Sequence, residues 1–245
     1  MIPSGLVTKS LAEQVREVLR SRIVGGHIAP GSRMDLDQLA TEFGVSITPV
    51  RDAIRLLEKD GLVVVQPRRG VFTAAADVKA FRDVFEARIA LECLAVETAA
   101  RRIPDAALAG LAGAYARAAA RLDLEGARDG DEAVLGPTDS AIHDLIVQHA
   151  DNDVVRELME SLRSRTAWAQ RLVADRAGRY RQSFAEHRAL LEALRARDTQ
   201  AAQLALRTHL ERARDHTLAA LAADAQGTAR AADGALASAA QGGAA

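Results

Sequence analysis

The sequence predicts a mainly α-helical protein with an N-terminal winged helix-turn-helix domain followed by a C-terminal all-α helical bundle. Apolar residues make up 49% of the 245 residues but aromatic residues only 3%, a composition that favours helix-on-helix packing over a sandwich or barrel. Residues 44–70 contain a turn, an amphipathic helix, a glycine stop and a basic hairpin. Beyond residue 77, apolar residues recur at helical spacing over most of the chain.

The N-terminal segment predicts two helices before the amphipathic one. Apolar residues at helical spacing indicate the first helix over residues 8–24. A glycine-containing turn over 25–32 follows, and residues 33–43 form the second predicted helix, which ends at Gly44. Two helices, a tight turn and a third helix are the ingredients of a helix-turn-helix, although a generic small helical subdomain is the alternative.

The third predicted helix has well-marked ends. Thr48 can cap it and Pro49 can take its first position, where the missing N–H costs nothing, and Gly61 closes it. Arg51 and Arg55 share a side of this helix that faces away from its apolar stripe. We therefore expect the arginines to be exposed to solvent.

A basic hairpin is predicted directly after this helix. Residues 62–66 are a β-branched run, residues 67–70 are a turn with Arg68 and Arg69, and residues 71–73 are the return strand. The hairpin supplies the wing of the domain.

The remainder of the chain predicts a bundle of about six helices. A small-residue, polar connection over 74–79 fits a domain boundary. The helices are expected over residues 77–102, 104–124, 138–150, 153–175, 179–197 and 199–223, with a polar loop over 126–137. We therefore expect a first domain over 1–75, a second over 76–223, and a disordered Ala/Gly-rich tail over 224–245.

Charge and cysteine content set only loose limits on function. Residues 1–75 carry 10 Lys/Arg and 8 Asp/Glu, an excess of two positive charges in a chain of formal net charge −1. The overall charge of the chain therefore does not indicate a nucleic-acid partner. Cys93 is the only cysteine, so no intramolecular disulfide can form. With no export signal and no apolar run of membrane-spanning length, we expect a cytoplasmic protein.

Three histidines and one aspartate in the second half could form a metal site. Asp139 and His143 are four residues apart, so their side chains project from one helical face. His187 and His209 lie in two later predicted helices among apolar residues. Imidazoles and a carboxylate that converge in a bundle can bind a divalent ion. The alternative is that the histidines are satisfied core residues and Asp139 only pairs with His143.

Enzymatic motifs are weak in this sequence. It contains no glycine-rich phosphate loop, no His-Glu-x-x-His and no nucleophile elbow. Glu186, next to His187, would point about 100° away on an ideal helix, which makes it a poor general base for a hydrolytic metal site. We therefore expect a protein that is not an enzyme.

Taken together, the residues resemble GntR-type transcriptional regulators of the FCD branch, the relatives of FadR. In the first half the resemblance rests on Pro30-Gly31-Ser32-Arg33, Leu39-Ala40, Gly44-Val45-Ser46, Thr48-Pro49-Val50-Arg51-Asp52-Ala53, Leu57-Glu58, Gly61-Leu62 and Arg69-Gly70. In the second predicted domain it rests on Arg88, Leu91-Glu92, Asp139, His143, Asn152, His187 and His209. It covers about residues 8–223, and the expected six helices resemble the VanR-like subgroup.

The resemblance implies a homodimeric, ligand-responsive repressor that binds a double-stranded DNA operator. The helix of residues 48–59 would enter the major groove, with Arg51 as the best candidate for a base contact. The other expected DNA contacts are Arg33, Ser46 and Thr48 to phosphates, Arg55, and Arg68, Arg69 and Gly70 from the wing. Relatives usually carry an arginine where Ile47 stands here, which implies an altered base preference.

The resemblance also implies a metal and an effector in the second domain. Its metal-binding positions are filled here by Asp139, His143, His187 and His209, and the ion would be Zn, Ni or Mn. Arg88 and Asn152 are the expected contacts of a small organic acid, although Arg88 could instead pair with Glu92. Two alternatives remain: a regulator whose second domain serves only dimerisation, and a helical metal-dependent enzyme.

Overall fold

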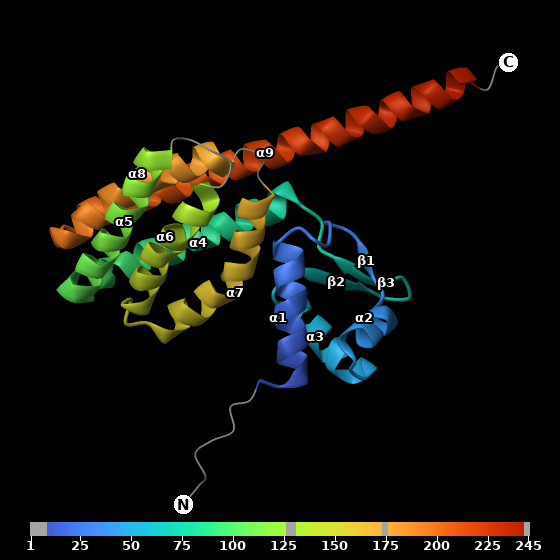
Figure 1. Cartoon of the computed structure of the whole chain (residues 1–245), viewed down its shortest axis with the longest axis horizontal. Coiled ribbons are helices and arrows are strands. Elements are labelled where there is room, and N and C mark those ends of the chain that lie inside the picture. Colours follow the sequence, from blue (N-terminus) through green and yellow to red (C-terminus); the bar gives the residue numbers. More distant parts are fainter. Residues whose placement is uncertain (1–8, 126–130, 173–175, 243–245) are drawn as a thin grey trace, which may run out of the picture. The chain divides into compact units, whose positions relative to one another are not determined.

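The computed structural model describes residues 9–125, 131–172 and 176–242. They separate into two compact units (Figure 1). One contains the residues up to Ala76 together with Ser161–Arg171, and the other contains Asp77–Glu160 and the chain from Leu172 onward. Within the described residues, no helix combines the length and apolar character that crossing a lipid bilayer demands.

The N-terminal unit is a three-helix core with a small sheet. Its elements are α1 (Leu11–Val24), β1 (Arg33–Met34), α2 (Leu36–Phe43), α3 (Ile47–Lys59), β2 (Val63–Gln66) and β3 (Gly70–Thr73). Both α1 and α2 pack on α3, and the antiparallel sheet has the order β1-β3-β2. The core includes Leu19, Ile23, Val50, Ile54, Leu57 and Leu62, all buried. The fold is therefore the predicted winged helix-turn-helix.

Two predicted boundaries in this unit are wrong. Arg33 and Met34 form a strand paired with β3 instead of starting the second helix, because the Asp35 side chain accepts hydrogen bonds from the amides of Asp37 and Gln38 and so starts α2 at Leu36. The N-cap of α3 is Ser46, not Thr48. Pro49, three residues after this N-cap, is tolerated because the first four N–H groups of a helix have no intrahelical partner.

The second unit contains six helices among the residues that the structure describes. They are α4 (Val78–Arg102), α5 (Asp105–Glu125), α6 (Asp131–Gln148), α7 (Asp153–Arg171), α8 (Arg176–Arg195) and α9 (Thr199–Gly242). Residues Ser161–Arg171 of α7 are counted with the first unit. Helix α4 packs against α6 and α9, and α8 packs against α6 and α9. Three helices, α6, α8 and α9, therefore meet around α4 in one bundle.

The largest differences between predicted and observed helix ends in this unit are at two places, and residues 173–175, predicted as the end of the fourth helix, lie outside the described range. Helix α6 begins at Asp131, inside the predicted loop, of which residues 126–130 lie outside the described range. Helix α9 continues to Gly242, through the segment predicted as a disordered tail. Alanine, the strongest helix former, dominates that segment and no proline interrupts it, so local propensity extends the helix without an apolar stripe.

Candidate metal centre and nucleic-acid interface

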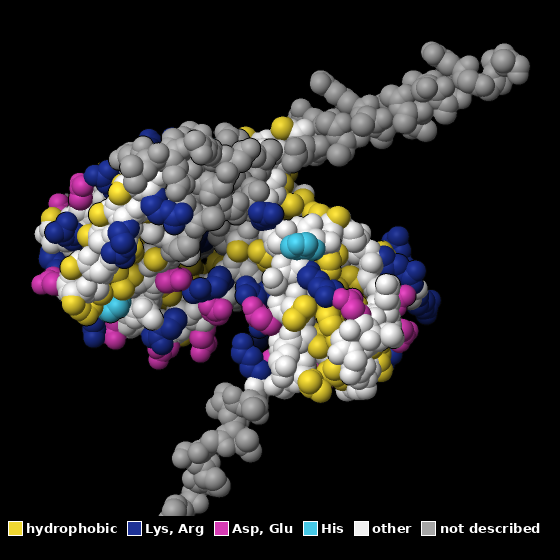
Figure 2. Space-filling view, viewed as in Figure 1, with side chains coloured by type: hydrophobic (Ala, Val, Ile, Leu, Met, Phe, Trp, Pro, Cys, Tyr) yellow, Lys and Arg dark blue, Asp and Glu magenta, His cyan; other side chains and the backbone are white. Residues whose placement is uncertain are grey.

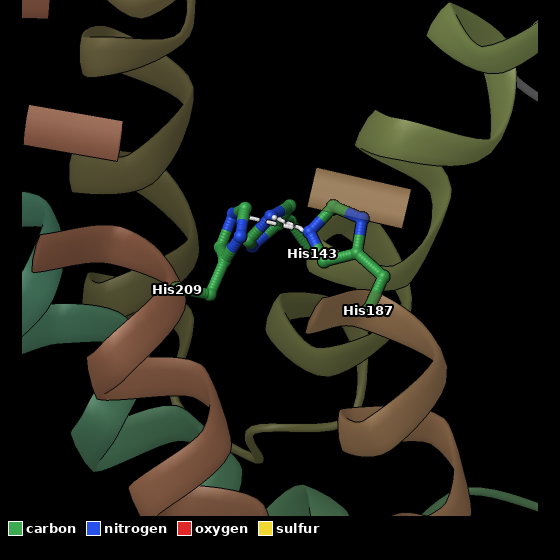
Figure 3. Close-up of side chains that lie close together, drawn as sticks. All are labelled: His143, His187 and His209. Atoms are coloured by element: carbon green, nitrogen blue, oxygen red, sulfur yellow. Dashed lines mark hydrogen bonds between the residues drawn. The ribbon is translucent and has the colours of Figure 1, made fainter. Parts of the chain in front are cut away.

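Three histidines from three helices converge inside the second unit (Figure 3). His143 comes from α6, His187 from α8 and His209 from α9, and their exposed fractions are 5%, 0% and 4%. The Nε2 atom of His187 lies 3.0 Å from Nε2 of His143 and 3.1 Å from Nε2 of His209. One ligand atom from each ring lies within 4.8 Å of the other two, so the three could hold a metal ion.

Apolar neighbours on each helix aim these rings inward. The buried side chains that flank the histidines along the sequence are Ile142, Ile146, Leu190, Leu191, Leu206 and Leu210. Each histidine therefore lies on the apolar stripe of its helix, at the spacing that turns it toward the core. Tyr115 on α5 closes one side: its hydroxyl donates to the carbonyl of Thr138 at 2.9 Å, and its ring meets His187 edge-on.

A carboxylate lies near the Nδ1 atom of each imidazole ring, on the side away from the cluster of Nε2 atoms. The distance from Oε2 of Glu92 to Nδ1 of His143 is 2.5 Å, and that from Oε2 of Glu186 to Nδ1 of His209 is 2.8 Å. Oδ1 of Asp139 lies 3.6 Å from Nδ1 of His187. Carboxylate–histidine pairs of this kind typically surround metal sites, because they orient the ring and raise the basicity of the opposite nitrogen.

Arginines hold two of these carboxylates in their ionised form. Burial alone would raise the pKa of Glu92, but the neighbouring Arg88 and His143 lower it to about 2. Burial opposes ionisation of Glu186 as well, and hydrogen bonds from His209 and Arg179 bring its pKa to about 2. Both carboxyl groups are therefore acceptors at neutral pH.

Two of the histidines, His187 and His209, are neutral at the same pH. Burial lowers the pKa of His209 to about 4, against the hydrogen bond to Glu186 that favours its charged form. Burial and the neighbouring His209 and His143 hold the pKa of His187 well below its usual range. Neutral imidazoles have a lone pair to offer, so the donor set fits a divalent transition metal ion such as Zn²⁺.

The other predicted ligands and effector contacts are placed differently. Oδ1 of Asp139 accepts a hydrogen bond from Ser183, and this carboxylate does not belong to the converging group. Arg88 donates from Nε to Glu92. The Asn152 side chain accepts from the amide of Val155 at the start of α7, in a pocket that none of the three histidines lines.

The sequence reading missed Glu92 and Glu186 as partners of the histidines. Glu92 had a weak signal, because it lies four residues after Arg88 on one helical face. Glu186 points away from His187 on the same helix, so spacing alone predicts no role for it at that ring. That direction brings it to His209 on the neighbouring helix.

The N-terminal unit presents exposed arginines from α3, β1 and the hairpin. Arg33, Arg51, Arg55, Arg68 and Arg69 are all exposed. Figure 2 shows Lys and Arg side chains gathered at the end of this unit that carries the hairpin. Only Arg55 has an ion pair with a carboxylate among the described residues, with Asp52 at 3.3 Å. The remaining guanidinium groups suit phosphate oxygens or base edges.

The start of α3 also suits contact with a phosphate. Ser46 is its N-cap, but the serine side chain makes no capping hydrogen bond. Thr48 is exposed and Ile47 is half-buried. Unpaired amides at a helix N-terminus attract anions. The hydroxyl groups and the amides of this turn are therefore both suited to hydrogen-bond a phosphate.

The wing turn has an unusual backbone. The amide of Arg69 donates to the carbonyl of Gln66 at 3.1 Å, Pro67 takes the second position, and Arg68 has φ 63°. This is the pattern of a type II turn, whose third position usually holds glycine or asparagine. Gly70 follows with φ 117°, beside the guanidinium of Arg33.

Comparison with known proteins identifies the family. The gntR family of bacterial regulatory proteins matches residues 11–73, and the FCD domain matches residues 83–212. The chain is 26% identical over 204 residues to the HTH-type transcriptional repressor RspR of Escherichia coli, with 83% of this chain and 87% of RspR covered. It is 28% identical over 206 residues to the HTH-type transcriptional regulator YdhC of Bacillus subtilis, with 81% and 87% covered.

Solved structures agree with this assignment. A GntR transcriptional regulator from Rhodococcus sp. RHA1 has a TM-score of 0.70 at 25% identity, over 85% of this chain and 98% of that one. The Escherichia coli protein McbR/YncC has the same fold, with a TM-score of 0.68 at 23% identity over 84% and 95%.

The chain therefore belongs to the GntR family of DNA-binding transcriptional regulators and carries an FCD domain. It binds DNA through its helix-turn-helix, and its relatives are regulators rather than enzymes.

Proposed function

We propose that the chain is a ligand-responsive repressor that acts as a homodimer on an operator with two half-sites. Residues 1–75 form the DNA-binding domain in this proposal, and residues 76–223 form the sensing and dimerisation domain. The repressor role is supported by RspR, which is named a repressor. The six helices from α4 to α9 in the described chain favour the VanR-like subgroup.

In this proposal each N-terminal unit inserts α3 into the major groove. Arg51 reads a base edge, because it is exposed near the start of α3 and no carboxylate among the described residues neutralises it. Arg33, Ser46 and Thr48 contact phosphates, and Arg68, Arg69 and Gly70 form the wing contact. Arg55 contributes less, because Asp52 already pairs with it.

The second domain in this proposal holds a divalent ion, Zn, Ni or Mn, on three imidazoles. The observation that carries it is the convergence of His143, His187 and His209 with a carboxylate behind each ring. Bound there, the ion would supply a Lewis-acidic position for the carboxylate of a small organic acid.

Arg88 is the proposed second anchor of that acid. Its Nε atom donates to Glu92, and this is its one hydrogen bond among the described residues, so the terminal amino groups can serve a second carboxylate. Asn152 directly precedes α7. We propose that it helps to shape the region that binds the effector.

The DNA half of the proposal is tested on the DNA upstream of the chain's own gene. Replacing Arg51 by Ala should weaken binding by about 1–3 kcal/mol and relax the preference at one base position, as measured by gel shift and fluorescence anisotropy. Lys59→Ala is the matched control, because it removes one exposed charge from the other end of α3. An Arg51→Ala protein with unchanged affinity and preference would remove Arg51 from base reading.

The metal half is tested by elemental analysis of the purified protein before and after reconstitution with Zn, Ni and Mn. We expect one ion per chain, and loss of it in His187→Ala. Thermal shift assays with a panel of organic acids, with and without chelator, then test the sensor. A protein that binds no metal and responds to no acid would favour a purely structural second domain.

A further inference from the structure

The wing of the N-terminal unit is held by the core only at its base. The wing is the hairpin of β2 and β3 with the turn between them, and Leu62 and Val63 at its base are 0% and 2% exposed. Val64 and Val65 follow and are 43% and 42% exposed. Successive side chains of a strand point to opposite faces of the sheet, so both faces of β2 are exposed to solvent here. Apolar packing alone therefore does not set the direction of the wing tip.

One edge of the wing is held by β1. The sheet order β1-β3-β2 places β3 in the middle, paired with Arg33 and Met34 of β1. The guanidinium of Arg33 also lies close to Gly70, where an added Cβ atom would be 3.3 Å from Nε. Strand β2 forms the other edge of the sheet. An edge strand leaves alternate backbone N–H groups without a partner in the sheet.

A side chain of α3 binds this second edge. Glu58 is the last residue but one of α3, and its Oε1 atom accepts a hydrogen bond from the amide of Val65 at 3.2 Å. Val65 lies in the middle of β2. Among the described residues, this is the one side-chain hydrogen bond between α3 and the wing. It joins α3 directly to the strand that leads into the wing turn.

The position of Glu58 is unfavourable for the helix itself. A carboxylate in the last turn of a helix lies near the negative end of the helix dipole. Glu58 forms no ion pair among the described residues that would offset this effect. The next residue, Lys59, has the charge that suits this end of α3. The partner in the wing therefore explains an acidic residue at position 58, and helix stability does not.

We propose that Glu58 is a positioning residue, which holds the wing at a fixed angle to α3 so that Arg68 and Arg69 reach DNA when Arg51 does. This inference rests on the wing contact in the proposed function. A helix in the major groove and a wing on the flanking backbone must bind at the same time. A wing that is already oriented loses less conformational freedom when it binds. Glu58 itself contacts no DNA in this proposal.

Two simpler roles for Glu58 predict different results. A carboxylate at a sheet edge can keep that edge from pairing with another chain, and loss of this protection would lead to self-association. A hydrogen bond can also serve only to stabilise the domain. Its loss would then lower the free energy of unfolding without changing how the wing meets DNA.

Glu58→Gln and Glu58→Ala form a matched pair of variants. Both remove the same negative charge, which by itself strengthens the attraction to DNA phosphates. Only glutamine keeps a side-chain oxygen that can accept from the amide of Val65. Hydrogen exchange of that amide, followed by nitrogen-15 NMR of the full-length protein, should be slower in wild type and in Glu58→Gln than in Glu58→Ala. Equal exchange rates in the two variants would overturn the link between α3 and the wing.

The salt dependence of DNA affinity measures the wing contact. The slope of log affinity against log salt concentration decreases in size by about 1 for each phosphate contact that is lost. On the DNA upstream of the chain's own gene, Glu58→Gln should keep the wild-type slope, and Glu58→Ala should lose about 1–2 of it, the share of two wing arginines. Fluorescence anisotropy at several salt concentrations measures both. Equal slopes in the two variants, with or without lower stability or self-association, would overturn the positioning role.

A protein with both Arg68→Ala and Arg69→Ala separates this inference from the proposed function. In that background Glu58→Ala and Glu58→Gln should bind DNA equally, because no wing contact is left to position. A difference that persists there would overturn the positioning role. If removing both arginines leaves DNA affinity and slope unchanged, the wing contact in the proposed function is wrong, and the inference fails with it. If their removal weakens binding but the two Glu58 variants have equal slopes, the wing contact stands and only the inference is overturned.

Discussion

Arg68 occupies a backbone position that glycine or asparagine usually fills. With φ 63° at the third residue of the wing turn, it adopts a left-handed conformation that costs a non-glycine residue about 1–2 kcal/mol. Strain of this kind persists where the side chain has a use. The wing contact with DNA proposed for the exposed Arg68 guanidinium would be such a use.

Replacing Arg68 by Gly should therefore separate stability from function. We expect the free energy of unfolding to rise by about 1 kcal/mol, because the turn strain is relieved, and operator affinity to fall, because one phosphate or groove contact is lost. Urea denaturation and DNA titration measure the two effects. Arg69→Ala removes a neighbouring charge at an unstrained position and should weaken binding without the gain. Loss of stability in Arg68→Gly would refute the strain argument.

The candidate metal site could be predicted only in part from the sequence. Asp139 and His143 were visible as a pair because helical spacing relates residues four apart. Glu92 and His143 are 51 residues apart, and Glu186 and His209 are 23 apart. Such contacts depend on how helices pack, which residue spacing does not encode. The same packing turned Asp139 toward the Nδ1 side of His187.

At the scale of elements, the side chain of Thr73 in the wing forms hydrogen bonds with the short turn before β1. Its hydroxyl donates to the carbonyl of Ala29 at 2.7 Å and accepts from the amide of Ser32 at 2.9 Å. The residue is only 2% exposed. One buried hydroxyl thus adds two hydrogen bonds to a turn whose own bond, from the amide of Ser32 to the carbonyl of Ala29, is 3.3 Å long.

The Thr73→Val variant should show how much these hydrogen bonds contribute to the free energy of unfolding. Valine keeps the shape but removes both hydrogen bonds of the hydroxyl, and a typical hydrogen bond contributes about 0.5–1.5 kcal/mol net, so we expect a loss of about 1–2 kcal/mol in the free energy of unfolding. Chemical denaturation followed by circular dichroism measures it. Thr73→Ser, which keeps the hydroxyl, is the control. Similar losses in both variants would show that packing of the methyl group matters more than the hydrogen bonds.

Helices and strands were largely predictable because their signals are local. The apolar stripe of α3, the stop at Gly61 and the β-branched run of β2 each depend on a few neighbouring residues. The strand β1 was missed because two residues carry no period of their own, and they become a strand only by pairing with β3. The length of α9 does not follow from an apolar stripe, because its last part has none and is helical through alanine propensity.

At the scale of the whole molecule, a sensor must couple two sites by free energy. An effector changes DNA affinity only through unequal affinity for the DNA-competent and DNA-incompetent states. The three histidines lie in one compact unit and the exposed arginines in the other. Their coupling must therefore be measured as a thermodynamic linkage between the two sites.

Reciprocity gives the sharpest test of that linkage. If an organic acid weakens operator binding about tenfold, operator DNA must weaken acid binding by the same factor, which corresponds to a coupling of about 1.4 kcal/mol. Calorimetric titration of acid into the metal-loaded protein, with and without operator, measures one side, and DNA titration at fixed acid measures the other.

Histidine variants test whether the metal site is responsible for the coupling between acid binding and operator binding. His187→Ala should abolish it, because the shared ligand at the centre of the cluster is lost. His149→Ala should preserve it, since His149 follows α6 and contacts the carbonyl of Leu145 instead of the cluster. Coupling that survives in His187→Ala and in chelator-treated protein would mean that the acid is sensed elsewhere, and the histidines would then stabilise the bundle without taking part in the response.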